Sequence, residues 1–304
     1  MADLHVNPPE TRRSVAQAVT PRWSVQLRAT AVLGRVVLYV VLVVVAGVFL
    51  LPFIWMISGA FKDPSEILTI PPVWIPHPPT LKNYQQAFSL VPVPRYYLNS
   101  AIIAVVATLG TLFSSCVVGY AFARLPAKGK NVWFVIALST MMVPFQVTLF
   151  PQYALYFKLG WVNTYLPLMV PPFLGVGGAL FIFLLRQFFL SIPNELEEAA
   201  VIDGCSTIGV FWRIMLPLAR TAMVTVVIFQ FVFTWNDFFG PLIYLTNSNM
   251  FTLPLGIATF QSAYGTEVGP LLALSLLAVI PILILFFVGQ KTFVQGIATT
   301  GLKG

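Results

Sequence analysis

Six long apolar stretches run through this chain and restrict what it can fold into. They lie near residues 36–60, 98–122, 132–150, 164–185, 219–245 and 271–289. Each reaches or approaches the roughly 20 residues that a helix needs to cross about 30 Å of hydrocarbon. A helix satisfies its own backbone hydrogen bonds inside a bilayer, whereas an isolated strand does not. The sequence therefore predicts an all-α polytopic membrane protein with six transmembrane helices.

Composition supports the membrane assignment. Hydrophobic residues make up 58% of the chain and charged residues 9%, a balance that a soluble domain of this length could not bury. Prolines interrupt the third and fourth stretches, so kinks are expected there. They are Pro144, Pro167, Pro171 and Pro172.

The distribution of basic residues predicts the orientation. If the N-terminus is cytoplasmic, all of the 17 Lys and Arg residues fall on that side except Lys62, Lys82, Arg95 and Lys158. This positive-inside bias places both termini in the cytoplasm. The same topology accounts for the net charge of +7, so we expect membrane lipid as a partner and no nucleic acid.

The chain divides into three parts by composition. Residues 1–32 predict a flexible cytoplasmic N-terminal extension, 33–290 a six-helix transmembrane domain, and 291–304 a cytoplasmic C-terminal tail. A proline-rich external loop joins the first two stretches, with a short interfacial helix expected to begin at Thr80.

The most polar interruption is the loop 191–217, where the pattern predicts a short, well-defined helix. Asn194 suits the N-cap, and Glu197 stands three residues later, as in a capping box. Gly204 suits the left-handed residue that ends a helix, and Ser206 suits the cap of a second helix. The helix signals alone leave two interpretations open, an amphipathic helix on the membrane surface or a rigid knob that fits a cleft on another protein.

Catalytic and metal-binding constellations are missing from the sequence. Gly129-Lys130-Asn131 lacks the upstream glycine and the hydroxyl residue of a phosphate-binding loop, so we expect no ATP hydrolysis by this chain alone. His5 and His77 lie outside the apolar stretches, so we expect no metal site there. Cys116 and Cys205 are expected to be free thiols.

A polar sequence within the fifth stretch is the candidate for a solute pathway. Trp235-Asn236-Asp237 brings a carboxylate into an otherwise apolar run, and a charge at bilayer depth costs at least about 2.5 kcal/mol unless it faces protein or water. In one interpretation Asn236 and Asp237 line the pathway or fix a neighbouring helix, and Trp235 offers its ring to a sugar. In the other, Trp235 belongs to an interfacial aromatic belt and Asp237 bonds to a partner subunit. Gln230 is a weaker pathway candidate.

The order of several short motifs resembles the maltose-permease type of carbohydrate importer subunit, from about residue 35 onward. The motifs are Phe61-Lys62, Pro64-Ser65-Glu66-Ile67, Leu81-Lys82-Asn83-Tyr84, Asn99-Ser100, Glu198-Ala199-Ala200-Val201-Ile202-Asp203-Gly204, Trp235-Asn236-Asp237 and Phe293-Val294-Gln295-Gly296. The segment from Glu198 to Gly204 is similar to the Glu-Ala-Ala loop of permeases in bacterial ATP-binding-cassette importers.

This resemblance implies a type I importer permease fold in the bacterial inner membrane. It implies a second homologous permease subunit, two copies of a cytoplasmic ATPase that binds ATP and Mg²⁺, and an external solute-binding protein. It also implies that part of the loop 191–217 is a coupling helix that docks in an ATPase cleft. The coupling residues carried over are Glu198, Ala199, Ala200, Asp203, Gly204, Phe211, Leu216 and Pro217.

An ion-gradient-driven secondary transporter is the alternative from another class. Such proteins usually show repeated halves and several charged residues at the middle of the membrane. This chain offers one such residue, Asp237, and no visible repeat.

Overall fold

The computed structural model describes residues 22–264 and 267–301, and the regular secondary structure of this part of the chain is helical, with no strand. The predicted all-α class is confirmed. The helices are α1 (Arg22–Ala60), η1 (Pro64–Glu66), α2 (Lys82–Leu90), α3 (Val93–Arg124), α4 (Lys130–Ser139), η2 (Thr140–Met142), α5 (Phe145–Lys158), α6 (Leu166–Met169), η3 (Pro171–Leu174), α7 (Ala179–Ser191), α8 (Asn194–Ile202), α9 (Thr207–Val210), η4 (Phe211–Met215), α10 (Leu216–Leu218), α11 (Arg220–Trp235), α12 (Phe239–Tyr244), η5 (Ser248–Met250), α13 (Leu253–Tyr264) and α14 (Val268–Gly301).

Four of the described helical segments are long and apolar enough to cross a membrane. They are Leu33–Ala60, Val93–Arg124, Leu166–Ser191 and Val268–Gln290. Two bent pairs bring the total to six if each pair counts as one span. They are Lys130–Met142 with Phe145–Lys158, bent by 98°, and Thr207–Leu218 with Arg220–Trp235, bent by 75°.

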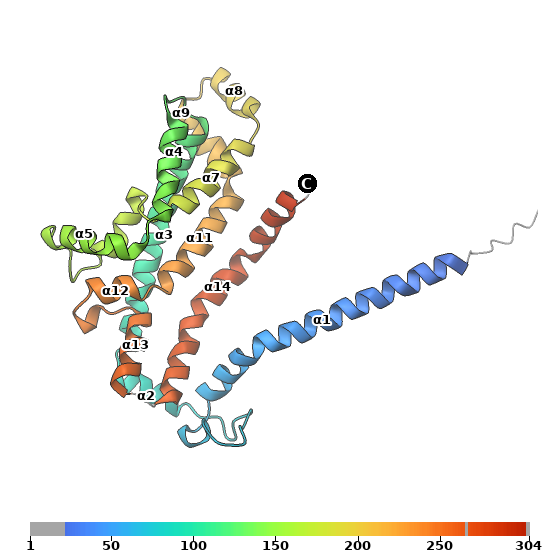
Figure 1. The fold of residues 1–304 in the computed structure, drawn as a ribbon, viewed down its shortest axis with the longest axis vertical. Coiled ribbons are helices and arrows are strands. Elements are labelled where there is room, and N and C mark those ends of the chain that lie inside the picture. The colour runs from blue at the N-terminus through green and yellow to red at the C-terminus, as the bar shows by residue number, and fades with distance from the viewer. Residues whose placement is uncertain (1–21, 265–266, 302–304) are drawn as a thin grey trace, which may run out of the picture. The chain divides into compact units, whose positions relative to one another are not determined.

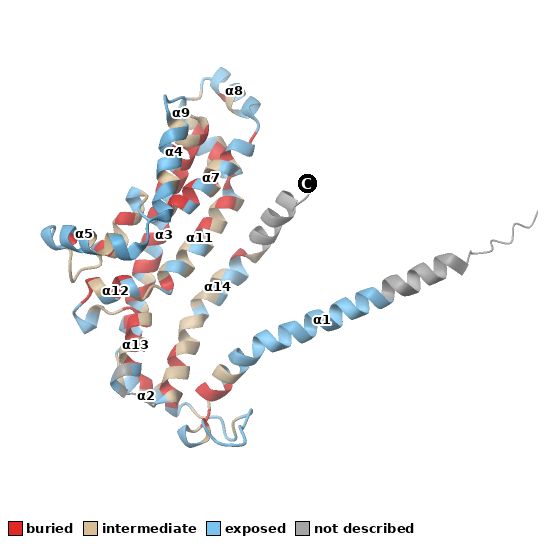
Figure 2. Cartoon of the chain, viewed as in Figure 1, coloured by how far each residue is buried: buried red, intermediate tan, exposed pale blue. Residues whose placement is uncertain are grey.

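The chain forms two compact units, residues 1–54 and 55–304, and α3 is the central helix of the second (Figure 1). Buried side chains concentrate where α3 packs against α7 and α11 (Figure 2). Gly119 makes this packing close, because a Cβ there would lie 3.2 Å from the backbone nitrogen of Arg186 on α7. Within this unit α8 and α9 lie at one end of α3, and α2 and α13 lie toward the other.

The predicted kinks occur, each with a local cause. The third stretch breaks at Pro144, which precedes α5 and cannot continue the ladder of helical hydrogen bonds. The fourth stretch is divided by η3, and Gly175 and Gly177 follow with left-handed φ angles of 78° and 77°. A residue with a Cβ rarely adopts that backbone conformation, so glycine is the residue that suits the break.

The prediction of one continuous fifth helix over 219–245 is wrong. Helix α11 ends at Trp235, and α12 begins at Phe239. The side chain of Asn236 donates to the carbonyl of Val232 at 2.8 Å, and Asp237 accepts from the backbone N–H of Gly240 at 3.1 Å. These local bonds between side chain and backbone compete with the helical ladder, so the carboxylate lies in a break between helices.

The loop after α1 contains the predicted short helix, now seen as α2. Asn83 on α2 is fully buried, and its Nδ2 donates to the carbonyls of Gly59 and Ala60 at 3.2 Å and of Lys62 at 2.8 Å. These contacts supply donors to carbonyls at the C-terminal end of α1 and in the turn that follows it, where the helical ladder of hydrogen bonds stops. Asn83, which the sequence marks only as part of a family motif, therefore links the end of α1 to α2.

Described helices reach into both of the predicted terminal segments. Residues 1–21 of the predicted extension 1–32 lie outside the described residues, and α1 begins at Arg22. At the other end α14 continues to Gly301, inside the predicted tail 291–304.

Candidate functional site

Helix α8 is short, and its C-terminal end is closed by a defined pattern of hydrogen bonds. The N–H of Cys205 donates to the carbonyl of Ala200 at 2.9 Å, and that of Gly204 donates to the carbonyl of Val201 at 3.0 Å. Gly204 has a φ of 84°, as this type of closure requires. The predicted role of Gly204 is confirmed, as is the cap by Ser206, whose Oγ accepts from the N–H of Gly209 at 3.2 Å.

The predicted capping box at the start of α8 is wrong. Asn194 is the first residue of the helix, the N-cap position belongs to Pro193, and no side chain caps the helix. Asn194 and Glu197 instead direct their side chains to α3. A partner distant in sequence has displaced the local interaction.

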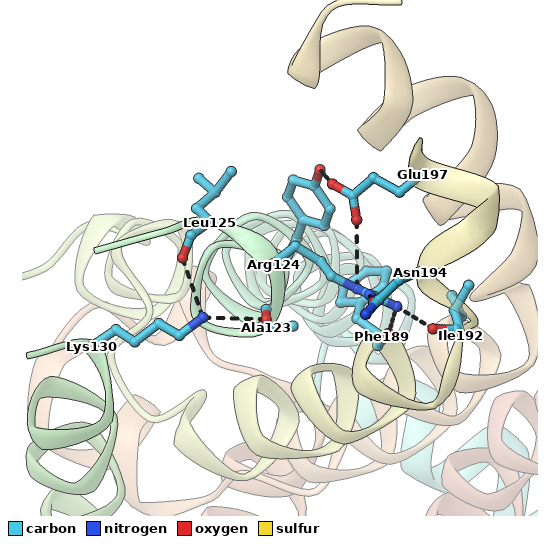
Figure 3. Close-up of polar contacts among 9 residues, drawn as sticks. Ala123, Arg124, Leu125, Lys130, Phe189, Ile192, Asn194 and Glu197 are labelled. Atoms are coloured by element: carbon cyan, nitrogen blue, oxygen red, sulfur yellow. Dashed lines mark hydrogen bonds and ion pairs between the residues drawn. The ribbon is translucent and has the colours of Figure 1, made fainter. Parts of the chain in front are cut away.

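That partner is Arg124, the last residue of α3 (Figure 3). Its guanidinium donates to the carbonyl of Phe189 at 2.7 Å and also to the carbonyl of Ile192 and the side-chain oxygen of Asn194. The Nε atom lies 3.7 Å from Oε2 of Glu197, and the arginine side chain is only 7% exposed. One rigid fork of donors thus joins the end of α3, the end of α7 and the start of α8.

Tyr120 adds a second link one turn earlier on α3. Its hydroxyl donates to Oε1 of Glu197 at 3.1 Å, and its ring packs against Phe189 and Phe211 with centroids 5.8 and 5.0 Å away. Both oxygens of Glu197 are therefore held by α3. Together with buried Ala200, these contacts fix α8 to the body of the protein.

The outer surface of the loop 191–217 is exposed and largely apolar. Leu196, Val201, Ile202, Ile208 and Trp212 are all exposed, and Ile202 is the most exposed at 84%. Acidic residues border them, namely Glu195, Glu198 and Asp203. Exposed apolar side chains with charged neighbours on a firmly held segment are typical of a surface that binds another protein.

The predicted coupling residues divide between that surface and the interior. Glu198, Ala199, Asp203, Gly204 and Pro217 are exposed, whereas Ala200 and Phe211 are buried and Leu216 is half-buried. Phe211 begins η4, a π-helical turn whose Met215 is fully buried. Such turns recur at functional sites, and here the turn precedes the 75° bend into α11.

A cavity of about 860 Å³ is the second candidate site. It is open on one side and is lined mainly by α5, the segment of α6 and η3, the end of α11, and α12. Its polar and aromatic lining includes Gln152, Tyr156, Gln230, Thr234, Asp237 and Tyr244. The volume lies within the range of small-molecule sites, which are usually apolar clefts with a few placed polar groups.

Gly240 allows the Asp237 carboxylate to lie close against α12 at this cavity. A Cβ on Gly240 would lie 2.5 Å from Oδ2 of Asp237 and 2.8 Å from the side chain of Leu168. The hydroxyl of Tyr244 is buried at the same site and has no hydrogen-bond partner in the described part of the chain. The Tyr244 ring is held by Tyr156, with centroids 5.3 Å apart.

Two of the four predicted pathway residues line the cavity and two do not. Gln230 and Asp237 line it, and Gln230 donates to Oγ1 of Thr234 at 2.9 Å. Trp235 is 2% exposed, and its Nε1 donates to the carbonyl of Ala278 at 2.9 Å, so its ring belongs to the core. Asn236 is exposed outside the cavity.

Sequence reasoning misses several residues of both sites. The sequence marks Arg124 only as a cytoplasmic charge, and Tyr120 gives no signal inside its apolar stretch. Gln152 and Tyr156 lie on α5, far in sequence from Asp237, and only the fold brings them together. Within residues 22–264 and 267–301, no group of three or more His, Cys, Asp or Glu could hold a metal ion.

The described helices, of which four and up to six segments are long and apolar enough to cross a membrane, are those of a polytopic membrane protein, and the comparisons give the family. Residues 115–299 match the family described as binding-protein-dependent transport system inner membrane component. The chain belongs to this family of inner-membrane permeases, so an ion-gradient-driven secondary transporter is the wrong class.

Relatives and solved structures agree along most of the length. The chain is 35% identical to the arabinooligosaccharides transport system permease protein AraQ of Halalkalibacterium halodurans over 86% of this chain and 93% of that one. It is 35% identical to the trehalose/maltose transport system permease protein MalG of Thermococcus litoralis, over 90% and 98%. A crystal structure of a bacterial transporter that imports the acidic polysaccharide alginate superposes with a TM-score of 0.73 at 21% identity, over 88% and 98%.

Proposed function

We propose that this chain is one of two different permease subunits of an ATP-binding-cassette importer for a sugar. Two ATPase subunits bind ATP and Mg²⁺ in this assembly, and an external solute-binding protein delivers the sugar. Family membership and the sugar-transport names of the relatives support the proposal. The permease domain is 33–290, and the distribution of basic residues supports a cytoplasmic loop 191–217.

In this assembly α8 is the coupling helix, and its exposed apolar residues dock in a cleft of the ATPase. The observation that carries this assignment is the fork of Arg124, which ties the base of α8 to the long central helix α3. A helix fixed in this way transmits a displacement of the ATPase to the membrane helices as a rigid-body movement. A mobile loop would absorb the same displacement.

Crosslinking in the whole complex tests the proposal. The full-length chain is purified from its native membrane with its partners, after Cys205, a free thiol in the same loop, is replaced by serine and cysteine is placed at Ile202 on α8. A matched control carries cysteine at Phe150 on α5, which is 79% exposed. We expect Ile202→Cys, and not Phe150→Cys, to crosslink to an ATPase subunit. An assembly without an ATPase, or equal crosslinking from both positions, would refute the proposal.

A further inference from the structure

We infer that the segment 68–81, in the loop after α1, inserts its apolar side chains into the lipid headgroup region beside the end of α1. Its partner is a lipid surface and not another protein. The inference goes beyond the proposed function, because it concerns how the loop is held at the membrane and not what the complex transports. Three observations carry it: exposed apolar side chains, a lack of charge, and attachment to the last turns of a membrane span.

The segment exposes large apolar side chains. Ile70 is 96% exposed, and Leu68, Trp74, Ile75 and Leu81 are exposed as well. Large apolar groups that gather on a surface mark contact with a membrane or with another protein. The described part of the chain leaves these side chains uncovered, so this apolar surface requires an outside partner.

The lack of charge favours lipid over protein. No Lys, Arg, Asp or Glu occurs between residues 68 and 81, and His77 is the only ionisable side chain there. Charged residues occur just outside the segment, where Nζ of Lys82 lies 2.6 Å from Oδ2 of Asp63 and both side chains are exposed. Charges are costly at membrane depth, so a lipid-facing segment is expected to exclude them.

The loop 191–217 offers a comparison within the same chain. Its exposed apolar side chains alternate with acidic residues, namely Glu195, Glu198 and Asp203. Surfaces that bind proteins combine apolar and charged groups in this way. The segment 68–81 has the apolar groups without the charged ones.

Contacts with α1 determine where the segment lies. The ring of Trp74 meets that of Trp55 edge to face, with centroids 5.3 Å apart, and Oγ of Ser58 donates to the carbonyl of Trp74 at 2.5 Å. At the end of the segment the N–H of Thr80 donates to the carbonyl of Phe61 at 2.8 Å. Since Trp55 and Ser58 belong to the span Leu33–Ala60, the segment folds back beside the last two turns of a membrane helix.

The length of the span gives the depth of this contact. Its 28 residues extend over about 42 Å, compared with roughly 30 Å of hydrocarbon and about 40 to 45 Å with both headgroup regions. Trp55 stands five residues before the end of the span, or about 7.5 Å along the helix, which is near the boundary between headgroups and hydrocarbon. Tryptophan is enriched at this level, and the contact with Trp55 brings Trp74 to it.

The backbone of the segment also suits the headgroup region. Irregular backbone is not found facing the hydrocarbon, because its N–H and C=O groups would lack partners, whereas water is present among the headgroups. Prolines reduce the number of such groups, since a proline has no backbone N–H. The segment contains Pro71, Pro72, Pro76, Pro78 and Pro79.

Spin labels on single cysteines test the inference in the whole complex. The full-length chain is purified with its partners and placed in lipid nanodiscs, after Cys205 is replaced by serine, while Cys116 is buried. The labelled variants are Ile70→Cys and Ile75→Cys, and the matched control is Gln85→Cys at an exposed position on α2. Ile70 and Ile75 are exposed, so their replacement removes little internal packing.

Power-saturation measurements compare oxygen, which concentrates in lipid, with a nickel chelate that stays in water. We expect the ratio of oxygen to nickel accessibility to be severalfold higher at positions 70 and 75 than at position 85. A ratio at positions 70 and 75 that equals that of the control would place the segment in water and overturn the inference. Labels shielded from both reagents would show that a protein covers the segment, and this result would overturn it too. None of these outcomes bears on the proposed function, which the crosslinking at Ile202 tests separately.

Discussion

The guanidinium of Arg124 at the end of α3 lies 3.7 Å from the carboxylate of Glu197 on α8, and the arginine side chain is 7% exposed. Seventy-three positions separate the two residues in the sequence. This pair is one of the contacts that attach α8, in the loop 191–217, to α3. Substitutions at this contact and elsewhere in the fold can test what each polar side chain does.

Loss of the Arg124 fork should disconnect α8 from α3. Arg124→Gln removes the ion pair with Glu197 and most of the bonds to Asn194 and to the carbonyls of Phe189 and Ile192. We expect a loss of about 2 to 3 kcal/mol in stability and ATP hydrolysis that continues without uptake. Thermal unfolding and the ratio of ATP hydrolysed to solute imported are measured.

The control for this substitution is Arg213→Gln, because Arg213 is exposed on η4 and has no ion pair within the described residues. It should change stability by less than about 0.5 kcal/mol. An Arg124→Gln complex with normal stability and normal coupling would show that the fork does not transmit force.

Two neighbouring glutamates on α8 should behave differently. Glu197 is held by Tyr120 and Arg124, whereas Glu198 is exposed. We expect Glu197→Gln to lower stability by about 1 to 2 kcal/mol because a charge-assisted contact is lost. Glu198→Gln should leave stability unchanged and weaken binding of the ATPase, which a pull-down titration measures. The assignment of the two side chains fails if their effects are reversed.

Gly204 should tolerate asparagine better than valine. Its φ of 84° is left-handed, and a Cβ added at this position would have no atom within 4 Å, so backbone strain alone decides the outcome. Asparagine adopts this conformation more readily than β-branched residues. We expect Gly204→Val to cost about 1 to 2 kcal/mol more than Gly204→Asn and to reduce coupling further. Equal effects in unfolding and uptake assays would mean that the closure of α8 is unimportant.

The link that Asn83 forms between the end of α1 and α2 should depend on its side-chain amide group. Asn83→Asp keeps the shape of the side chain and replaces a donor by an acceptor facing the carbonyls of Gly59, Ala60 and Lys62. We expect a loss of at least about 2 kcal/mol, since buried carbonyls would then meet a carboxylate without a donor. Gln85→Glu on the same helix is the control. The melting temperatures of the two variants should differ by several degrees. Coincident unfolding curves would show that Asn83 does not stabilise the junction of α1 and α2.

The sequence determined the features that depend on local order along the chain. Apolar length predicted where the membrane-spanning segments lie, and Pro144 predicted the break before α5. Gly204 and Ser206 predicted the end of one helix and the start of the next, because each acts on backbone groups only a few residues away. These residues can be interpreted without knowing which other helices pack against the segment that contains them.

Only the tertiary structure decided which partners the polar side chains choose. Asn194 and Glu197 had a plausible local role at the start of α8, but Arg124 and Tyr120 reach them across the fold and form the stronger contacts. Asp237 and Gln152 meet at one cavity because α5 and α12 are brought together by packing. Contacts between residues distant in sequence depend on how helices cross, and the periodicity of a single segment does not contain that information.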